Sequence, residues 1–138
     1  MITTKGRYAL RVMIDLAEHE DNKPVPLKEI AERQEISKKY LEIITKELVR
    51  GGMVIGRGGK GGGYRLSREP EDYTALEILE LMEGTIAPVA CLECGAKPCK
   101  REAICKTLPM WKEFDQITRS FFAGKTLKDL LQKTCTPS

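Results

Sequence analysis

The chain has 138 residues, of which 41% are hydrophobic and 31% are charged, a composition typical of a globular protein and not of a disordered one. No apolar run approaches the roughly 20 residues that a membrane-spanning helix needs, and the amphipathic N-terminus has no apolar signal core. We therefore expect a cytoplasmic protein without a membrane partner. Thiols stay reduced there, so the five cysteines favour metal or redox chemistry over disulfides.

The net charge of +3 is unevenly distributed along the chain. Residues 1–68 hold fourteen Lys and Arg against nine Asp and Glu, whereas residues 69–138 hold nine against eleven. A basic half joined to a mildly acidic half suggests a module that binds a polyanion and carries a second function. We accordingly divide the chain after residue 68.

Helical periodicity predicts three helices in the first fifty residues. The first covers roughly 5–20 and the second roughly 27–33, with a two-proline connector between them. Ser37 is a good N-cap for the third, which two glycines end at about residue 51. On this third helix we expect an inward stripe of Leu41, Ile44 and Leu48 and an outer face of Lys38, Lys39, Glu42, Thr45 and Lys46.

Two short helices joined by a tight turn, the second one basic outside, are typical of a helix-turn-helix. The segment MVIGRGGKGGGYRLS that follows has strand-like ends at 53–55 and 64–66 around a glycine-rich loop with Arg57 and Lys60. It predicts a β-hairpin whose two cations reach phosphates or a minor groove, although they could also be solvated in a flexible loop. The expected fold class is mainly α with a small β-hairpin wing, a winged helix-turn-helix DNA-binding domain over residues 1–68.

Residues 69–138 are expected to contain a cysteine loop and a dimerisation helix region. We predict a fourth helix over 75–83, an irregular loop over 85–107, a fifth helix opened by Pro109 and a short last helix. The fifth carries a stripe of Trp111, Phe114, Ile117 and Phe121, which can pack on a partner or on its own domain. A single winged helix buries little DNA surface, so a homodimer on a palindromic operator in double-stranded DNA is expected.

The stretch CLECGAKPCKREAIC holds four of the five cysteines, namely Cys91, Cys94, Cys99 and Cys105. Thiolates suit iron–sulfur clusters, and this C-x2-C-x4-C-x5-C spacing allows a short loop to wrap one. The same thiols fit an all-thiolate zinc site or a metal-free thiol–disulfide sensor, and the spacing alone does not separate the three. The fifth thiol, Cys135, is interpreted as an idle residue of the tail.

The motifs TTKGRYAL at 3–10, SKKYLEII at 37–44 and GKGGGYRL at 59–66, together with Cys91, Cys99 and Cys105, resemble the family of bacterial regulators that includes IscR, NsrR, RirA and CymR. The resemblance covers nearly the whole chain. It implies a homodimeric winged-helix transcription factor, not an enzyme, that dimerises through a long helix matching 109–122. Members with loop cysteines are similar in binding an iron–sulfur cluster, so the resemblance favours a 2Fe-2S cluster, with 4Fe-4S as the alternative.

Residue roles in DNA binding follow from the same resemblance. The residues that read bases match Lys39, Tyr40 and Glu42, and the family's wing arginine falls at Gly58, one position after Arg57. For Tyr40 the alternative is partial burial against the second helix. The complete set of expected DNA-binding residues is Ser37, Lys38, Lys39, Tyr40, Glu42, Lys46, Arg57 and Lys60.

The fourth cluster ligand departs from the family pattern. The cluster-biogenesis regulator has a histidine where this chain has Leu108, and the nitric-oxide sensor uses an acidic residue where this chain has Arg7. The expected ligands are therefore Cys91, Cys99 and Cys105, with Cys94 or a residue of the partner chain as the fourth. We expect a repressor that governs iron–sulfur cluster assembly or iron and redox homeostasis. A metal-free thiol or nitric-oxide-responsive regulator is the alternative, and a zinc-binding or metal-trafficking protein fits less well.

Overall fold

The computed structural model describes residues 2–19, 23–92 and 104–131. Its helices are α1 (Thr4–Glu18), α2 (Leu27–Gln34), α3 (Lys38–Arg50), α4 (Ala75–Glu83), α5 (Leu108–Ala123) and α6 (Leu127–Leu131), with 3-10 turns η1 (Pro70–Asp72) and η2 (Ala90–Leu92). Strands β1 (Val54–Arg57) and β2 (Gly63–Leu66) pair as one antiparallel hairpin. The fold is mainly α with a small β wing, as predicted. No helix among the described residues is long and apolar enough to cross a lipid bilayer.

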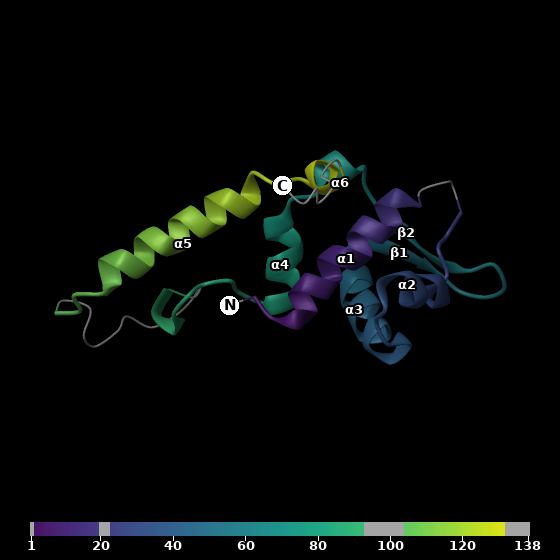
Figure 1. The fold of residues 1–138 in the computed structure, drawn as a ribbon, viewed down its shortest axis with the longest axis horizontal. Coiled ribbons are helices and arrows are strands. Elements are labelled where there is room, and N and C mark those ends of the chain that lie inside the picture. Colours follow the sequence, from purple (N-terminus) through teal and green to yellow (C-terminus); the bar gives the residue numbers. More distant parts are fainter. Residues whose placement is uncertain (1, 20–22, 93–103, 132–138) are drawn as a thin grey trace, which may run out of the picture.

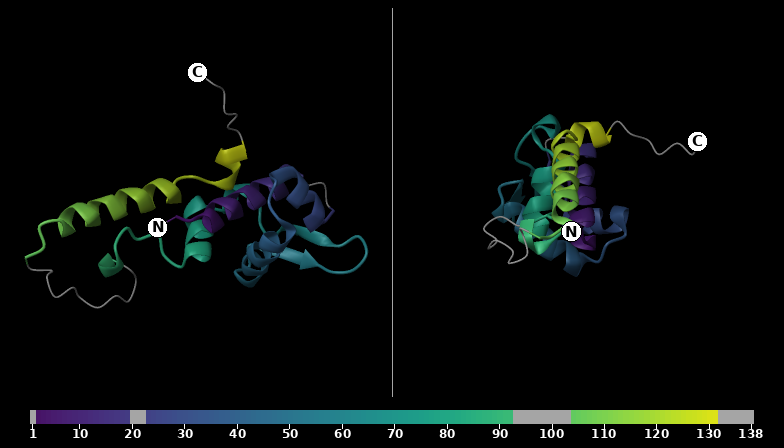
Figure 2. Two further views of the ribbon diagram at one scale, coloured as in Figure 1. Left: turned by 60° about the horizontal axis from the view of Figure 1, so that its bottom comes forward. Right: turned by 90° about the vertical axis from the view of Figure 1, so that its left-hand side faces the viewer.

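Helix α1 runs through the centre of the molecule, between α2, α3 and α4 (Figure 1). Its inward residues share one core with those of α3, α4 and the hairpin, and α6 closes this core through Leu127. The wing and α5 lie at opposite ends of the molecule in Figure 1 and in the left view of Figure 2. Helix α3 and the hairpin are thus supported from behind by α1, while α5 projects away from them.

Local capping fixes the start of α3 and of α4. The Ser37 hydroxyl accepts a hydrogen bond from the Tyr40 amide at 3.2 Å, as an N-cap does. Thr74 and Glu77 form a reciprocal capping box at the start of α4, with bonds of 3.1 and 3.0 Å. These short-range contacts explain why the bounds of both helices agree with the sequence prediction.

The inward stripe of α3 is confirmed, but one residue predicted on its outer face is buried. Leu41, Ile44 and Leu48 are fully buried, and so is Thr45. The Thr45 hydroxyl donates to the Leu41 carbonyl oxygen of the preceding turn at 2.8 Å, which satisfies the polar group inside the core. The prediction for Thr45 was wrong because a threonine can supply its own hydrogen bond within a helix.

The glycines of the wing allow the connector before α2 to join the hairpin. Val25 and Tyr64 exchange two backbone hydrogen bonds of 2.8 and 2.9 Å, so the connector adds an isolated bridge to β2. A Cβ atom at position 63 would lie 2.4 Å from the Val25 carbonyl group. Gly63 is therefore required by this close approach.

A buried tyrosine ties the base of the wing to the helices. Tyr73 is fully buried, and its hydroxyl accepts hydrogen bonds from the Ser67 and Arg68 amides at 2.9 Å each. The same hydroxyl donates to the Met53 carbonyl oxygen at 2.6 Å. One phenol thus satisfies backbone groups on both sides of the hairpin.

We expect Tyr73→Phe to lower the free energy of unfolding by about 2 kcal/mol, because it removes the hydroxyl that accepts from two amides and donates to the Met53 carbonyl oxygen at the base of the wing. Urea denaturation measures the change. Tyr64→Phe is the matched control, since the Tyr64 hydroxyl makes no hydrogen bond within the described residues, and it should change the stability by less than about 0.5 kcal/mol. Equal losses in the two variants would contradict this role of the Tyr73 hydroxyl.

Candidate nucleic-acid interface and cysteine segment

The outer face of α3 presents charged side chains to solvent. Lys38, Lys39, Glu42 and Lys46 are all exposed, as predicted for a helix that reads a DNA groove. Behind this face, Lys5 of α1 and Glu47 of α3 form an ion pair with an N–O distance of 2.5 Å. Helix α3 is therefore attached to α1 through a charged contact as well as through the core.

Tyr40 is half-buried and contacts α1. Its ring packs edge-on against Tyr8, with ring centroids 5.8 Å apart and an interplanar angle of 71°. The Arg11 guanidinium lies 5.0 Å from the centre of the Tyr8 ring, and it also donates a hydrogen bond to the Gln34 carbonyl oxygen. This stacked arrangement limits the rotamers of Tyr40 and leaves part of its side chain accessible beside the N-terminus of α3.

A groove of about 400 Å³ separates α2 from the wing and brings together cations from three elements. Lys38 of α3 and Arg57 of β1, both predicted from the sequence, line this groove. Lys28 of α2 lines it too, although sequence reasoning did not select it. Its position in the first turn of α2, the first helix of the helix-turn-helix, is the sequence feature that could have indicated this location. The groove also exposes backbone of the wing glycines, which lets a phosphate approach closely.

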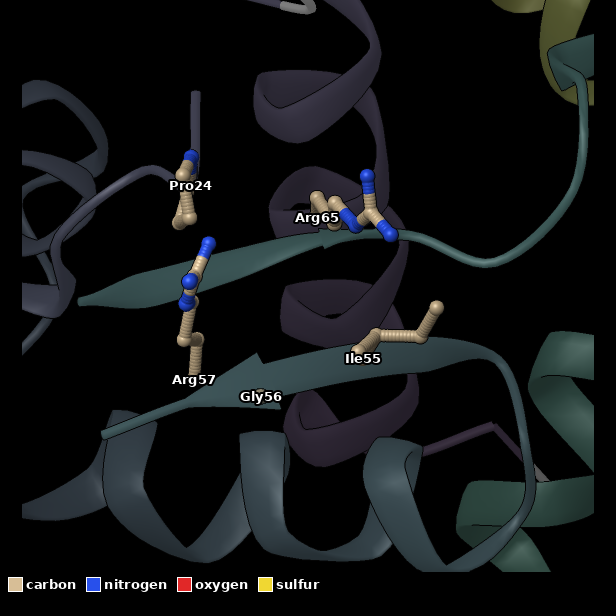
Figure 3. Close-up of a pocket in the computed structure, with 5 residues that line it drawn as sticks. All are labelled: Pro24, Ile55, Gly56, Arg57 and Arg65. Carbon is tan, nitrogen blue, oxygen red and sulfur yellow. The ribbon is translucent and has the colours of Figure 1, made fainter. Parts of the chain in front are cut away.

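The face of the hairpin that points away from the core is basic. Ile55 pairs with Arg65, and Arg57 pairs with Gly63, so both arginines share this face with an exposed isoleucine. Figure 3 shows Arg57 pointing toward Pro24 of the connector, with Arg65 on the neighbouring strand, around a cavity of about 240 Å³. Within the described ranges neither arginine has a carboxylate partner. Lys60, at the tip of the wing, is exposed.

A buried carboxylate network fixes the angle between α1 and α2, and the sequence analysis did not find it. Asp15 of α1 is fully buried, and it accepts hydrogen bonds from Arg33 at 2.8 and 3.0 Å and from Gln34 at 2.9 Å. Burial by itself would raise the pKa of Asp15, but these hydrogen bonds and the Arg33 charge outweigh it and lower the pKa below 3.8. His19 lies beside the network, with Nδ1 2.8 Å from the Asp15 carbonyl oxygen.

The structure describes two of the four predicted cysteine ligands. Cys91 is exposed within η2, and Cys105 is half-buried with Sγ 3.4 Å from the Thr107 hydroxyl. Cys94 and Cys99, like Cys135, lie outside the described residues. Within 2–19, 23–92 and 104–131, no three His, Cys, Asp or Glu side chains are grouped as metal ligands. The complete ligand set therefore stays a prediction.

Helix α5 exposes most of the apolar stripe predicted for it. Phe114, Ile117 and Phe121 are 48%, 61% and 56% exposed, and Met110 beside them is 52% exposed. Trp111 is half-buried and packs edge-on against Phe114, with ring centroids 6.4 Å apart. An exposed contiguous row of large apolar side chains is typical of an interaction surface.

A helix-turn-helix followed by a basic hairpin, with a further helix bearing an apolar face, defines a winged-helix DNA-binding protein. The sequence profile of the Rrf2 family, described as iron-dependent transcriptional regulator, matches residues 2–133. The chain belongs to this family, and it is a transcriptional regulator. The family membership that the motifs predicted is confirmed.

Relatives and solved structures agree with this assignment. The chain is 35% identical over 130 residues to the HTH-type transcriptional regulator IscR of Aliivibrio salmonicida, which covers 94% of this chain and 76% of that protein. The solved structure of CymR, the global cysteine regulator of B. subtilis, is similar with a TM-score of 0.78 and 37% identity, covering 97% of this chain and 98% of that one. The structure of IscR from T. potens is similar with a TM-score of 0.75 and 32% identity, covering 99% and 93%.

We expect Arg33→Gln to destabilise the fold by about 3 kcal/mol at pH 7, because it leaves the buried Asp15 carboxylate without its charged partner. The folded-state pKa of Asp15 lies below its ordinary value of 3.8, so the ionised pair stabilises the fold above that pH and this contribution is lost as the pH falls below it. Urea denaturation should therefore show a difference between the variant and the wild type that shrinks in acid.

Arg50→Gln provides the matched control, since Arg50 is likewise the basic residue in the last turn of its helix and is exposed. Its expected cost is below about 1 kcal/mol, from the helix dipole alone. A pH-independent difference for Arg33→Gln would contradict the network.

Proposed function

We propose that the protein is a homodimeric repressor whose affinity for a palindromic operator in duplex DNA is controlled by an iron–sulfur cluster in the cysteine segment, residues 91–105. The observation that carries this proposal is the connection between that segment and α5. Cys105 lies three positions before Leu108, the first residue of α5, so a group bound by the segment would also fix the base of the helix with the exposed apolar stripe.

The DNA-reading half of the proposal rests on the outer face of α3 and on the groove beside it. Lys39, Tyr40 and Glu42 would contact base edges in the major groove, with Ser37, Lys38 and Lys46 on either side of them. Arg57 and Lys60 of the wing, together with Lys28, would contact phosphates or the neighbouring minor groove. Phosphate contacts position the protein on the duplex, and base contacts give it sequence specificity.

The dimer half rests on the stripe of α5. These large apolar side chains are about half exposed, and covering them with a second copy would lower the free energy by removing apolar surface from water. Two copies joined along α5 would present two α3 helices with a fixed separation, as a palindromic operator requires. A change in the angle of α5 would change this separation.

The donor chemistry of the segment fits an iron–sulfur cluster. Cysteine thiolates are the usual ligands of such clusters, and the sequence supplies four within fifteen residues. The Thr107 hydroxyl, 3.4 Å from Cys105 Sγ, can donate to the thiolate, and hydrogen bonds to sulfur tune the reduction potential. Leu108 is buried and has no donor atom, so Cys94 or a residue of the partner would complete the ligand set. When bound, the cluster would supply sensitivity to iron, oxygen or nitric oxide.

Regulation by such a segment requires little energy. A tenfold change in operator affinity corresponds to about 1.4 kcal/mol of preference for the DNA-competent arrangement. Genes for iron–sulfur cluster assembly or for iron and redox homeostasis are the proposed targets, in keeping with the family description as iron-dependent.

A metal-free thiol regulator of the same fold is the second candidate function. Cys91 is exposed and accessible to oxidants, and the structural neighbour CymR is described as a cysteine regulator. The two candidates differ in the iron and sulfide content of protein purified without oxygen.

We expect Lys28→Gln and Arg57→Gln each to reduce the salt dependence of operator binding by about one unit in the slope of log Kobs against log salt, because each removes one phosphate contact. Fluorescence anisotropy with a labelled palindromic duplex measures the slope. Lys128→Gln, which replaces an exposed lysine of α6, should leave the slope unchanged. Slopes equal to the wild-type value in both groove variants would place the DNA elsewhere.

We expect Cys91→Ala and Cys99→Ala, purified without oxygen, to lack the visible charge-transfer absorption and the iron of the wild type, because each loses a thiolate ligand. Their operator affinity should match that of wild type from which iron was removed. Cys135→Ala is the control and should keep both colour and regulation. Retained iron would remove the substituted residue from the ligand set. A colourless, iron-free wild type whose operator affinity does not depend on redox state would contradict the proposed function.

A further inference from the structure

The N-terminus of α1 is capped by a side chain from α4. Thr3 is the N-cap residue, but its own side chain makes no capping hydrogen bond. Instead Glu83, the last residue of α4, accepts hydrogen bonds at Oε1 from the amides of Thr3 and Gly6, at 2.9 and 3.0 Å. The Thr3 hydroxyl donates to the same carboxylate at 2.7 Å. A carboxylate in this place satisfies unpaired amides of the first turn and interacts favourably with the helix dipole.

The glycine of the TTKGRYAL motif makes room for this carboxylate. A Cβ atom at position 6 would lie 2.5 Å from Glu83 Oε1 and 3.2 Å from a methyl group of Leu79. Gly6 is buried within α1, where a glycine lowers helix stability relative to alanine. The close approach of α4 therefore explains a residue that helix propensity alone disfavours.

The N-terminus of α1 and the C-terminal part of α4 each contact α3. Lys5, beside Gly6, forms the 2.5 Å ion pair with Glu47 of α3. Leu81 of α4 packs directly on Gly51 at the end of α3, where a Cβ atom would lie 2.4 Å from a Leu81 methyl group. A displacement of the last turn of α4 therefore acts on α3 both directly and through α1.

We infer that Glu83 is a positioning residue that transmits the state of the cysteine segment to α3. The chain between them is short and anchored, since Cys91 follows Glu83 by eight positions and Ile86 and Ala87 are only 3% and 5% exposed. Binding of the cluster at the segment changes the last turn of α4, the Glu83 carboxylate carries this change to the first turn of α1, and the Lys5–Glu47 pair carries it to α3. The inference rests on the proposed function, because it concerns how that segment controls DNA binding.

The test compares operator affinity with and without the cluster in Glu83→Gln, which keeps the shape of the side chain and removes its charge. Wild type is expected to show a ratio of about tenfold between the two states. The variant should load the same iron per chain, remain a dimer and show a ratio within about twofold of one. Glu71→Gln removes the same charge from an exposed residue of η1 and should keep the wild-type ratio.

The ratio separates a positioning role from a merely structural one. A general loss of stability lowers the affinity of both states alike, so a loaded Glu83→Gln protein that keeps the wild-type ratio overturns the inference. Thr3→Val is a milder variant that removes one donor to the carboxylate, and it should reduce the ratio partly. If Glu83→Gln does not fold, Thr3→Val replaces it in the test, and an unchanged ratio in Thr3→Val then overturns the inference.

Hydrogen exchange on the unloaded protein tests the link without any cluster. In Glu83→Gln the Gly6 amide should exchange about fivefold faster, as expected for a lost helix cap, and amides of α3 should lose protection with it. Amides of α2 should be unchanged. Unchanged protection in α3 overturns the inference even if wild type binds no cluster, whereas a wild type without cluster-dependent affinity contradicts only the proposed function.

Discussion

The position of the recognition helix depends on how α1 is held, and one carboxylate near each end of α1 holds it. Glu83 caps its N-terminus from α4, and Asp15 near its C-terminus binds Arg33 and Gln34 at the end of α2. The core supplies most of the favourable free energy of packing, but apolar contacts are non-directional. Hydrogen-bonded carboxylates have a required geometry. They therefore determine the angles at which α2 and α4 meet α1, and with them the surface offered to DNA.

The Asp15 network favours a defined arrangement of α1 and α2 in addition to stabilising the fold. Removing a carboxylate from water is unfavourable, and a pair of this kind is often matched in stability by apolar residues of the same size. Here the Arg33 side chain stays 33% exposed, which reduces its desolvation penalty, and the partners of Asp15 outweigh its burial and lower its pKa. Any slip of α2 along α1 would leave a charge unpaired inside the protein. The network thus excludes alternative registers of the helix-turn-helix.

Sequence reasoning predicted the features that depend on neighbours in the chain. The bounds of α3 and α4 follow from periodicity and capping residues, and the fold class follows from the order of the elements. It missed contacts between distant positions, such as Glu83 with Gly6, 77 positions apart, because no local pattern reports which carboxylate reaches a helix end. The strand ends differed from the prediction for the same reason, since Gly63 joins β2 through its approach to Val25. In the cysteine segment only Cys91 and Cys105 are placed, so the ligand set still rests on spacing and resemblance.

Helix α4 contacts α1 on one side and α5 on the other, and the two contacts differ in strength. On one side, Ile78, Leu79 and Met82 are buried, so α4 and α1 form one packed body. On the other, Arg119 of α5 meets Glu80 of α4 at 3.1 Å, with side chains 34% and 38% exposed, and such a pair contributes about 1 kcal/mol or less. This ion pair therefore adds little to the attachment of α5, which also rests on the buried Leu108 at its start and on the bridge between Thr74 and Thr126 just after its end. Under the proposed function, a small bias at the cysteine segment would act through the firmly packed α1 and α4 on α3 without loosening the core.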